Sequence, residues 1–155
     1  MITLIGALDV EANKLINKTA EKLKDMKLSK PEFVGLVKTG PNVQRPPENE
    51  DFWFVRCASI LHQAYVRNTI GTNRLRTHYG GKKKRGRRPE KTVRAGGSTI
   101  RKAMQELEKA QLLEKTGEKK IRNKGGKDVM LYSGRKLTAK GRKLLDSVAK
   151  EVRVG

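Results

Sequence analysis

A run of positive charge in the middle of the chain is the part of the sequence best suited to chemistry. Residues 80–91 read GGKKKRGRRPEK, with six Lys or Arg at the seven positions 82–88. From Arg74 to Arg94 there are ten basic residues and one acid, Glu90. Guanidinium and ammonium groups at this density can bind phosphates and release their counterions. The formal charge of +20 over 155 residues likewise indicates a polyanionic partner.

The same run approximates a nucleotide-binding loop but lacks the groups that such a loop requires. Gly81 and Gly86 fit the pattern G-x-x-x-x-G-K-[ST], whereas Arg87 and Arg88 stand where Lys and then Ser or Thr are needed. No apolar strand precedes the run, and no helix directly follows it. We therefore reject a nucleotide site. A terminal tail is excluded because the run lies mid-chain, and a targeting signal would not explain the basic residues that follow.

Catalytic and metal chemistry have little support. His62 and His78 are sixteen positions apart and have no Cys or acid nearby at ligand spacing. Cys57 is the only cysteine and lies in an apolar stretch, which predicts a buried side chain. Most acids alternate with Lys along helical segments, where local ion pairs are expected. We expect no enzyme activity, no metal and no cofactor.

Four segments with helical periodicity frame the basic run, because their apolar residues recur every three or four positions. Asp9, Ser98 and Thr138 are the predicted N-caps of three of them. The last has one apolar face and an internal glycine, Gly141, which predicts close packing against a neighbour. The four segments are 9–26, 51–67, 98–111 and 138–152.

The segments between these helices differ in character. KPEFVGLVKTG at 30–40 suits a short helical turn that begins at Pro31 and ends at Gly40. Residues 41–51 hold three of the five prolines and predict an ordered loop. Residues 68–97 show no sustained period and hold six of the fifteen glycines, so we predict a basic irregular loop there.

Two of the predicted helices carry basic faces. On 51–67 a polar stripe is either merely solvated or faces phosphates; it consists of Arg56, Ser59, Gln63 and Arg67. The helix 98–111 has an apolar face, and its opposite face holds Ser98, Arg101, Lys102, Gln105 and Lys109. Two glycines before this helix leave backbone N–H groups accessible at its positive end, so with Arg94, Arg101 and Lys102 it predicts a phosphate seat.

The last third of the chain adds a hairpin. Two strands, 112–116 and 129–132, are predicted on either side of a basic tip at 117–128. The order helix, helix, basic-faced helix and hairpin predicts a winged helix-turn-helix-like core. The expected fold is mainly α, with a small β-hairpin wing and additional helices in one domain over residues 1–155. At this level DNA and structured RNA are both open as ligands.

Stretches spread along most of the chain match one family pattern. They are PEFVGLVKTG, DFWFVRCASILHQAYVRNTIG, YGG, and GRKLTAKGRKLLD after a helix ending in ELEKAQLLEK. Together, from about residue 6 to 150, they resemble the archaeal and eukaryotic small-subunit ribosomal protein S-nineteen-e family, and the basic tip resembles the archaeal form. The resemblance implies a winged-helix-like core, a place in the head of the small subunit, and a part in its maturation. It also implies RNA contact by Arg56, Arg67, Tyr79, Gly80, Gly81, Arg101 and Lys102.

We therefore expect a structural constituent of the small ribosomal subunit that binds ribosomal RNA and acts in translation and ribosome biogenesis. Its expected partners are that RNA and neighbouring small-subunit proteins, in the cytoplasm, and the free chain is expected to be a monomer. No membrane partner is expected, because the N-terminal MITLIGALDV is too short to span a bilayer. The alternative is a winged-helix DNA-binding regulator or chromatin protein. The expected RNA-binding residues are Arg56, Arg67, Arg74, Arg76, Tyr79, Gly80, Gly81, Lys82, Lys83, Lys84, Arg85, Arg87, Arg88, Lys91, Arg94, Ser98, Arg101, Lys102 and Gln105.

Overall fold

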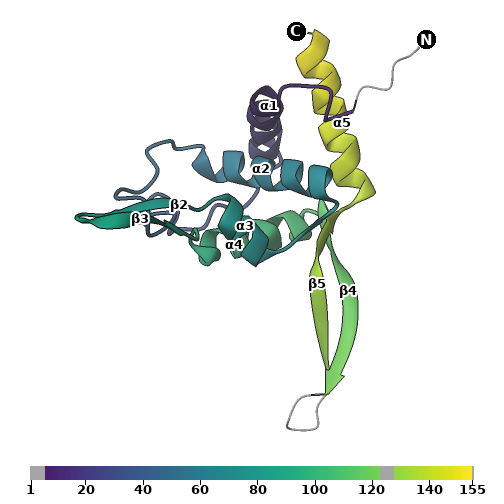
Figure 1. The fold of residues 1–155 in the computed structure, drawn as a ribbon. Helices are drawn as coiled ribbons and strands as arrows, with labels where there is room; N and C mark the ends of the chain where they lie inside the picture. Colours follow the sequence, from purple (N-terminus) through teal and green to yellow (C-terminus); the bar gives the residue numbers. More distant parts are fainter. Residues whose placement is uncertain (1–5, 123–127, 155) are drawn as a thin grey trace.

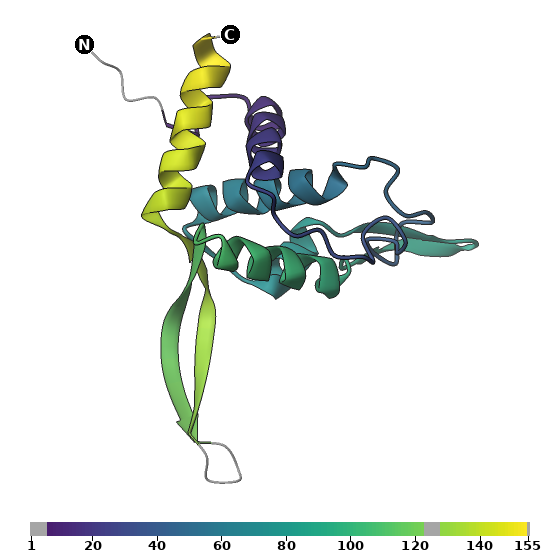
Figure 2. The ribbon, with the colours of Figure 1, turned by 180° about the vertical axis from the view of Figure 1, so that it is seen from behind.

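The computed structural model describes residues 6–122 and 128–154 and shows a mixed α/β fold (Figure 1, and Figure 2 from behind). Within these residues there are five helices and two small antiparallel sheets, so strands contribute more than the mainly α prediction allowed. The elements are α1 (Ala12–Asp25), α2 (Phe52–Arg67), β1 (Thr69–Ile70), α3 (Thr72–His78), β2 (Gly81–Arg85), β3 (Arg88–Val93), α4 (Gly97–Lys109), β4 (Leu113–Arg122), β5 (Asp128–Leu137) and α5 (Ala139–Val154).

Helix α2 lies at the centre of the helical body. Helices α1 and α5 pack against each other and against α2, and α4 packs against α2 from the opposite side (Figure 1). Two β-hairpins leave this body in different directions, and the β4–β5 hairpin extends away from α5. Strand β5 also pairs with β1, Thr69 opposite Lys136, which gives the sheet order β1-β5-β4.

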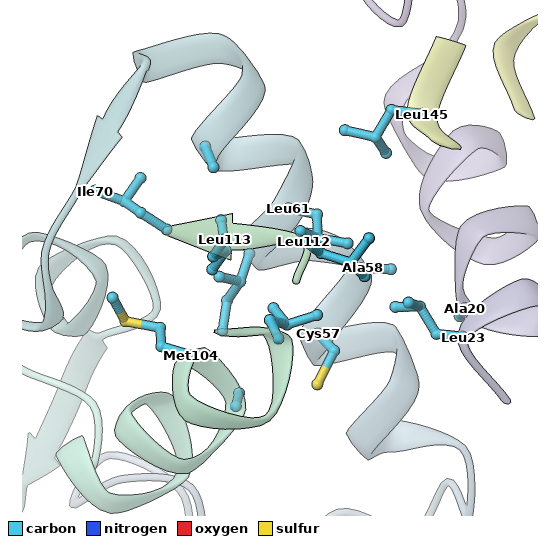
Figure 3. Packing of buried hydrophobic residues seen from close by; sticks show 14 of the residues in the cluster. Ala20, Leu23, Cys57, Ala58, Leu61, Ile70, Met104, Leu112, Leu113 and Leu145 are labelled. Carbon is cyan, nitrogen blue, oxygen red and sulfur yellow. The ribbon is translucent and has the colours of Figure 1, made fainter. Parts of the chain in front are cut away.

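One apolar core joins these elements (Figure 3). Trp53 and Cys57 of α2 are fully buried, and they share the core with Leu23 of α1, Met104 of α4 and Leu145 of α5. The prediction that Cys57 is buried is therefore confirmed. Burial raises the pKa of the Cys57 thiol to about 12, so the thiol stays protonated and unreactive at neutral pH.

Of the three predicted N-caps, one is confirmed and two are wrong. Thr138 precedes α5, and its Oγ1 accepts a hydrogen bond of 3.1 Å from the Gly141 N–H, as a capping side chain does. Asp9 is not an N-cap, because α1 begins at Ala12 and the Asp9 carboxylate accepts instead from the Gly6 N–H at 2.8 Å. Ser98 is not one either, since α4 begins at Gly97 and Ser98 lies within its first turn.

The segment 30–40 is not a helical turn, contrary to the prediction. It forms turns joined by an isolated bridge between Val34 and Val37. Gly35 adopts a φ of +95°, which a continuing right-handed helix does not allow. Residues 41–50 lie outside helices and strands, as predicted.

Residues 68–97 are not an irregular loop, so that prediction is wrong. They contain β1, the short helix α3 and the β2–β3 hairpin, in which Lys82 pairs with Thr92 and Lys83 with Lys91. Every residue from Lys82 to Thr92 is exposed. Because no apolar residue alternates along these strands, the sequence carries no strand period to detect.

The β4–β5 hairpin is longer than predicted. Its strands run over 113–122 and 128–137, so much of the predicted tip at 117–128 is strand. Residues 123–127, with Lys124 and Lys127, lie outside the described residues. The close packing predicted for Gly141 is confirmed, since an added Cβ would lie 2.6 Å from the Leu112 carbonyl oxygen.

Candidate nucleic-acid interface

The excess charge is confined to one part of the chain. Residues 1–51 contain eight basic and eight acidic residues, so the whole +20 belongs to 52–155. Among the described residues, no ion pair involves a basic side chain from Arg56 to Lys102. Cations elsewhere do have partners, for example Arg135 with Glu108 at 3.0 Å. The exposed basic residues of 56–102 are therefore left available to an external anion.

Arg76 and Arg101 converge at the start of α4. A Cβ on Gly97 would lie 3.2 Å from Arg101 Nη1 and 3.3 Å from Arg76 Cδ, so both side chains lie against this glycine. Arg76 Nε donates to the Ala95 carbonyl oxygen at 2.9 Å, which fixes its side chain. No side chain caps α4, and its N-terminus carries partial positive charge. We name Arg76, Gly97 and Arg101 the α4 seat.

The outward side of α4 continues this positive surface. Ser98, Arg101, Lys102 and Gln105 are exposed, as expected from their helical spacing. The opposite side of the helix is buried in the core through Ile100, Ala103, Met104 and Leu107. The predicted amphipathic helix is confirmed, although Lys109 pairs with Glu106 at 2.7 Å and adds less free charge.

The predicted stripe on α2 divides into two parts. Arg56 is partly buried, with its guanidinium carbon 3.9 Å from the centroid of the Tyr79 ring and 5.1 Å from that of Phe52. Burial lowers the pKa of Arg56, and no carboxylate compensates this cost among the described residues. Arg67 at the other end is exposed. The exposed Arg67 is available to a phosphate, whereas Arg56 is held against two aromatic rings, and RNA contact by either residue stays a prediction.

The β2–β3 hairpin presents the densest set of cations. Its exposed basic residues are Lys82, Lys83, Lys84, Arg85, Arg87, Arg88 and Lys91. Its base is anchored, because the Gly96 N–H donates to the Thr39 carbonyl oxygen at 2.7 Å. An added Cβ on Gly81 would lie 2.7 Å from Asn42 Nδ2, and one on Gly80 would collide with the Val93 carbonyl oxygen. Gly80 and Gly81 thus have a packing role, and their contact with RNA stays a prediction.

The structure also brings together residues that the sequence did not group. Lys38 and Gln44, from the loop before α2, line one hollow of about 620 Å³ with Lys82, Lys83 and Lys84. Arg67, Arg74 and Arg94 line another. Lys38 and Gln44 were missed because no local pattern indicates that their loop returns to the hairpin.

The fold and this surface define a small, strongly basic protein with an open cationic face. None of the helices in the described part of the chain has the length and hydropathy needed to cross a bilayer. The chain matches Ribosomal protein S19e over residues 6–154 and belongs to that family. The resemblance inferred from its sequence stretches is thereby confirmed.

Similar proteins occur in both archaea and eukaryotes. The chain is 39% identical over 152 residues to the small ribosomal subunit protein eS19 of Aeropyrum pernix, covering 96% of this chain and 90% of the relative. It is 35% identical over 154 residues to eS19G of Ascaris suum, covering 99% and 95%, respectively. For eS19 of Thermoplasma volcanium the identity is 34% over 144 residues, covering 92% and 86%. Family membership identifies a ribosomal protein of the small subunit and not an enzyme.

Proposed function

We propose that this chain binds small-subunit ribosomal RNA through its cationic face and thereby supports assembly and maturation of the subunit. The observation that carries the proposal is the α4 seat, where Arg76 and Arg101 converge on Gly97 without a carboxylate partner in the described structure. The positive charges of both side chains and the positive end of the helix favour an anion at this place. A backbone phosphate is such an anion.

The order of elements supports a winged-helix-like arrangement for the core. Helices α2, α3 and α4 are followed by the β4–β5 hairpin, and β1 joins that hairpin's sheet. In this arrangement α4 takes the place of the recognition helix and β4–β5 that of the wing. The exposed side of α4, with Arg101, Lys102 and Gln105, would then face the nucleic acid.

The mechanism is charge neutralisation between separate RNA segments. The β2–β3 hairpin and the α4 seat lie on different elements, and Thr39 and Ala95 hold those elements in a fixed relation. Phosphates bound at both places would be held at a defined distance, and their mutual repulsion would fall. This mechanism needs no second copy of the chain, and we propose that the free chain is a monomer. In the cytoplasmic ribosome its neighbours are that RNA and other small-subunit proteins.

A double substitution tests the proposal. Arg101→Gln with Lys102→Gln removes two exposed charges from α4, and Lys143→Gln with Lys150→Gln removes two from α5 as a matched control. Because charge-assisted hydrogen bonds contribute about 1.5–3 kcal/mol each, the α4 variant should bind purified small-subunit RNA at least about tenfold more weakly than the control. Filter binding and co-sedimentation with small subunits measure this. Equal losses in both variants would contradict the proposal.

The DNA-binding alternative makes a different prediction in the same assay. A winged-helix regulator would select one duplex DNA sequence and would be absent from small subunits after a high-salt wash. Membership of Ribosomal protein S19e favours the ribosomal role.

A further inference from the structure

A second basic feature lies along α3, the helix that also carries Arg76 of the α4 seat. One side of this helix carries four polar residues, Asn73, Arg74, Thr77 and His78, while the Leu75 side chain is buried. They line a surface hollow together with Arg67 from the end of α2 and Arg94 from the linker after β3. We name these six residues the arginine pocket.

The arginine pocket has the size of a small-ligand site. Its volume of about 400 Å³ lies above the lower limit, about 300 Å³, of small-ligand pockets, although it is a shallow hollow open to solvent and not an enclosed cavity. A single inorganic anion would therefore leave much of it unfilled. Three separate segments line it, namely the end of α2, α3 and the linker after β3, so it can receive a group that protrudes from a strand.

The charges of the arginine pocket are all of one sign. No Asp or Glu lines it, and Arg67, Arg74 and Arg94 are absent from every ion pair among the described residues. Each guanidinium offers five N–H donors in a planar fork that suits phosphate oxygens. Three such groups around one hollow bind a phosphate more strongly than one exposed side chain can.

His78 gives the same hollow an uncharged aromatic surface. Burial, together with the nearby charges of Arg67 and Arg56, lowers the pKa of His78, so its ring is neutral at pH 7. Its other close neighbour is Tyr79, whose ring lies edge to face at 4.9 Å between centroids. A neutral imidazole can stack against a nucleobase, and aromatic side chains commonly hold unstacked bases of RNA in this way. The amide of Asn73 adds donors and an acceptor for a base edge.

We propose that the arginine pocket holds one unpaired RNA nucleotide, with its phosphate against Arg67, Arg74 and Arg94 and its base against the His78 ring. The proposal rests on the RNA-binding function proposed above and assigns a nucleotide site separate from the α4 seat. It predicts that the arginine pocket prefers single-stranded RNA to duplex RNA, whereas the other basic residues of the cationic face have no such preference.

Binding to two probes tests this assignment. An octauridylate and an RNA duplex of equal charge are titrated at fixed salt into the native chain and into two triple variants. The pocket variant is Arg67→Gln, Arg74→Gln, Arg94→Gln, and the charge-matched control on α5 is Lys143→Gln, Lys150→Gln, Arg153→Gln. Relative to the control, the pocket variant should lose at least tenfold more affinity for octauridylate than for the duplex. Equal affinity of both variants for octauridylate would overturn the proposal.

A second measurement locates the nucleotide without relying on a triple variant. Octauridylate containing 4-thiouridine is cross-linked to the native chain, and the modified peptides are identified by mass spectrometry. Cross-links at residues 73–78 that His78→Ala removes support the site, whereas cross-links confined to other residues overturn it. If the native chain binds no RNA of any kind, the proposed function itself fails. If the native chain binds small-subunit RNA but the pocket variant and its control bind octauridylate equally, only the proposal for the arginine pocket fails.

Discussion

The guanidinium carbon of Arg56 lies 3.9 Å from the centroid of the Tyr79 ring, so a partly buried charge rests on an aromatic face. The Tyr79 hydroxyl and Ser59 Oγ are 2.8 Å apart, within hydrogen-bond distance. One tyrosine thus uses its face for Arg56 and its edge for Ser59. Arg56 and Ser59 belong to α2, and Tyr79 follows α3. These contacts therefore hold the end of α3 in place against α2.

The two contacts of Tyr79 can be separated by substitution. Tyr79→Phe keeps the ring under Arg56 but removes the hydrogen bond to Ser59, so the free energy of unfolding should fall by about 1 kcal/mol. Tyr79→Leu removes the aromatic face as well and should cost about 1 kcal/mol more. Urea denaturation measures both. Tyr132→Phe, at an exposed tyrosine, is the control, with an expected change below about 0.5 kcal/mol. A Tyr79→Phe variant as stable as this control would contradict the role of the hydroxyl.

The buried thiol of Cys57 predicts a loss of stability in alkali. Its pKa is raised from 9.0 to about 12 in the folded chain, so unfolding releases a proton at any pH between these values. A raised folded pKa gives stability that is complete below pH 9 and is lost as pH rises toward 12. Between pH 8 and 10.5 the free energy of unfolding should fall by about 2 kcal/mol from this group alone.

The control for this effect is Cys57→Ala. Lys and Tyr residues also titrate in this range, but they are the same in both proteins, so the difference between the two pH profiles isolates the thiol. Chemical denaturation at several pH values gives the profiles. Parallel curves for the native chain and Cys57→Ala would show that the thiol is accessible in the folded state.

Helices were predictable where burial leaves a regular trace in the sequence. In α2, Trp53, Cys57, Ile60, Leu61 and Ala64 recur at helical spacing because that side of the helix meets the core. The β2–β3 hairpin leaves no such trace, since its residues from Lys82 to Thr92 are exposed. The β4–β5 hairpin was predicted too short for a related reason, because its pairing continues to Arg122 and Asp128, where charged residues face each other.

The candidate site was predictable only where one element carries it. Arg101, Lys102 and Gln105 share a helical face, so their spacing alone indicates a common surface. The approach of Arg76 to Gly97 depends instead on how α3 packs against α4, which no local pattern encodes. Lys38 similarly reaches the hairpin only through the return of its loop.

Gly141→Ala should destabilise the chain although alanine favours helices. An added Cβ would lie 2.6 Å from the Leu112 carbonyl oxygen and 2.9 Å from Leu137 Cδ1, and backbone on one side leaves little room to move. Overpacking of this kind costs about 1–3 kcal/mol. Most of this range exceeds the gain of about 1 kcal/mol in helix propensity that alanine brings over glycine. We expect a net loss of about 1 kcal/mol by thermal or urea unfolding.

Gly71→Ala provides the matched control for Gly141→Ala. Gly71 precedes α3 with an extended backbone, and a Cβ there would meet no atom within 4 Å. The substitution should therefore be neutral or stabilise by up to about 1 kcal/mol through the unfolded state. If Gly141→Ala were as stable as Gly71→Ala, the approach of α5 to Leu112 would have to be looser than the structure shows.

The basic hairpin should contribute to binding and little to folding. Replacing Lys82, Lys83, Lys84, Arg85, Arg87 and Arg88 by Gln changes only exposed side chains, so the melting temperature should move by a few degrees at most. If these six groups contact phosphates, the log–log slope of RNA affinity against salt should shrink by about 4 to 5. Incorporation into small subunits should weaken in parallel.

The control for the hairpin variant removes the same charge from α1, the turn directly after α1, and α5; both helices lie away from the hairpin (Figure 1). It replaces Lys14, Lys18, Lys27, Lys143, Lys150 and Arg153 by Gln. Long-range attraction depends on net charge and should weaken alike in both variants, whereas the salt slope depends on the phosphates actually contacted. A smaller slope in the hairpin variant alone therefore identifies direct contact. Equal slopes in the two variants would show that the hairpin is merely solvated in the complex.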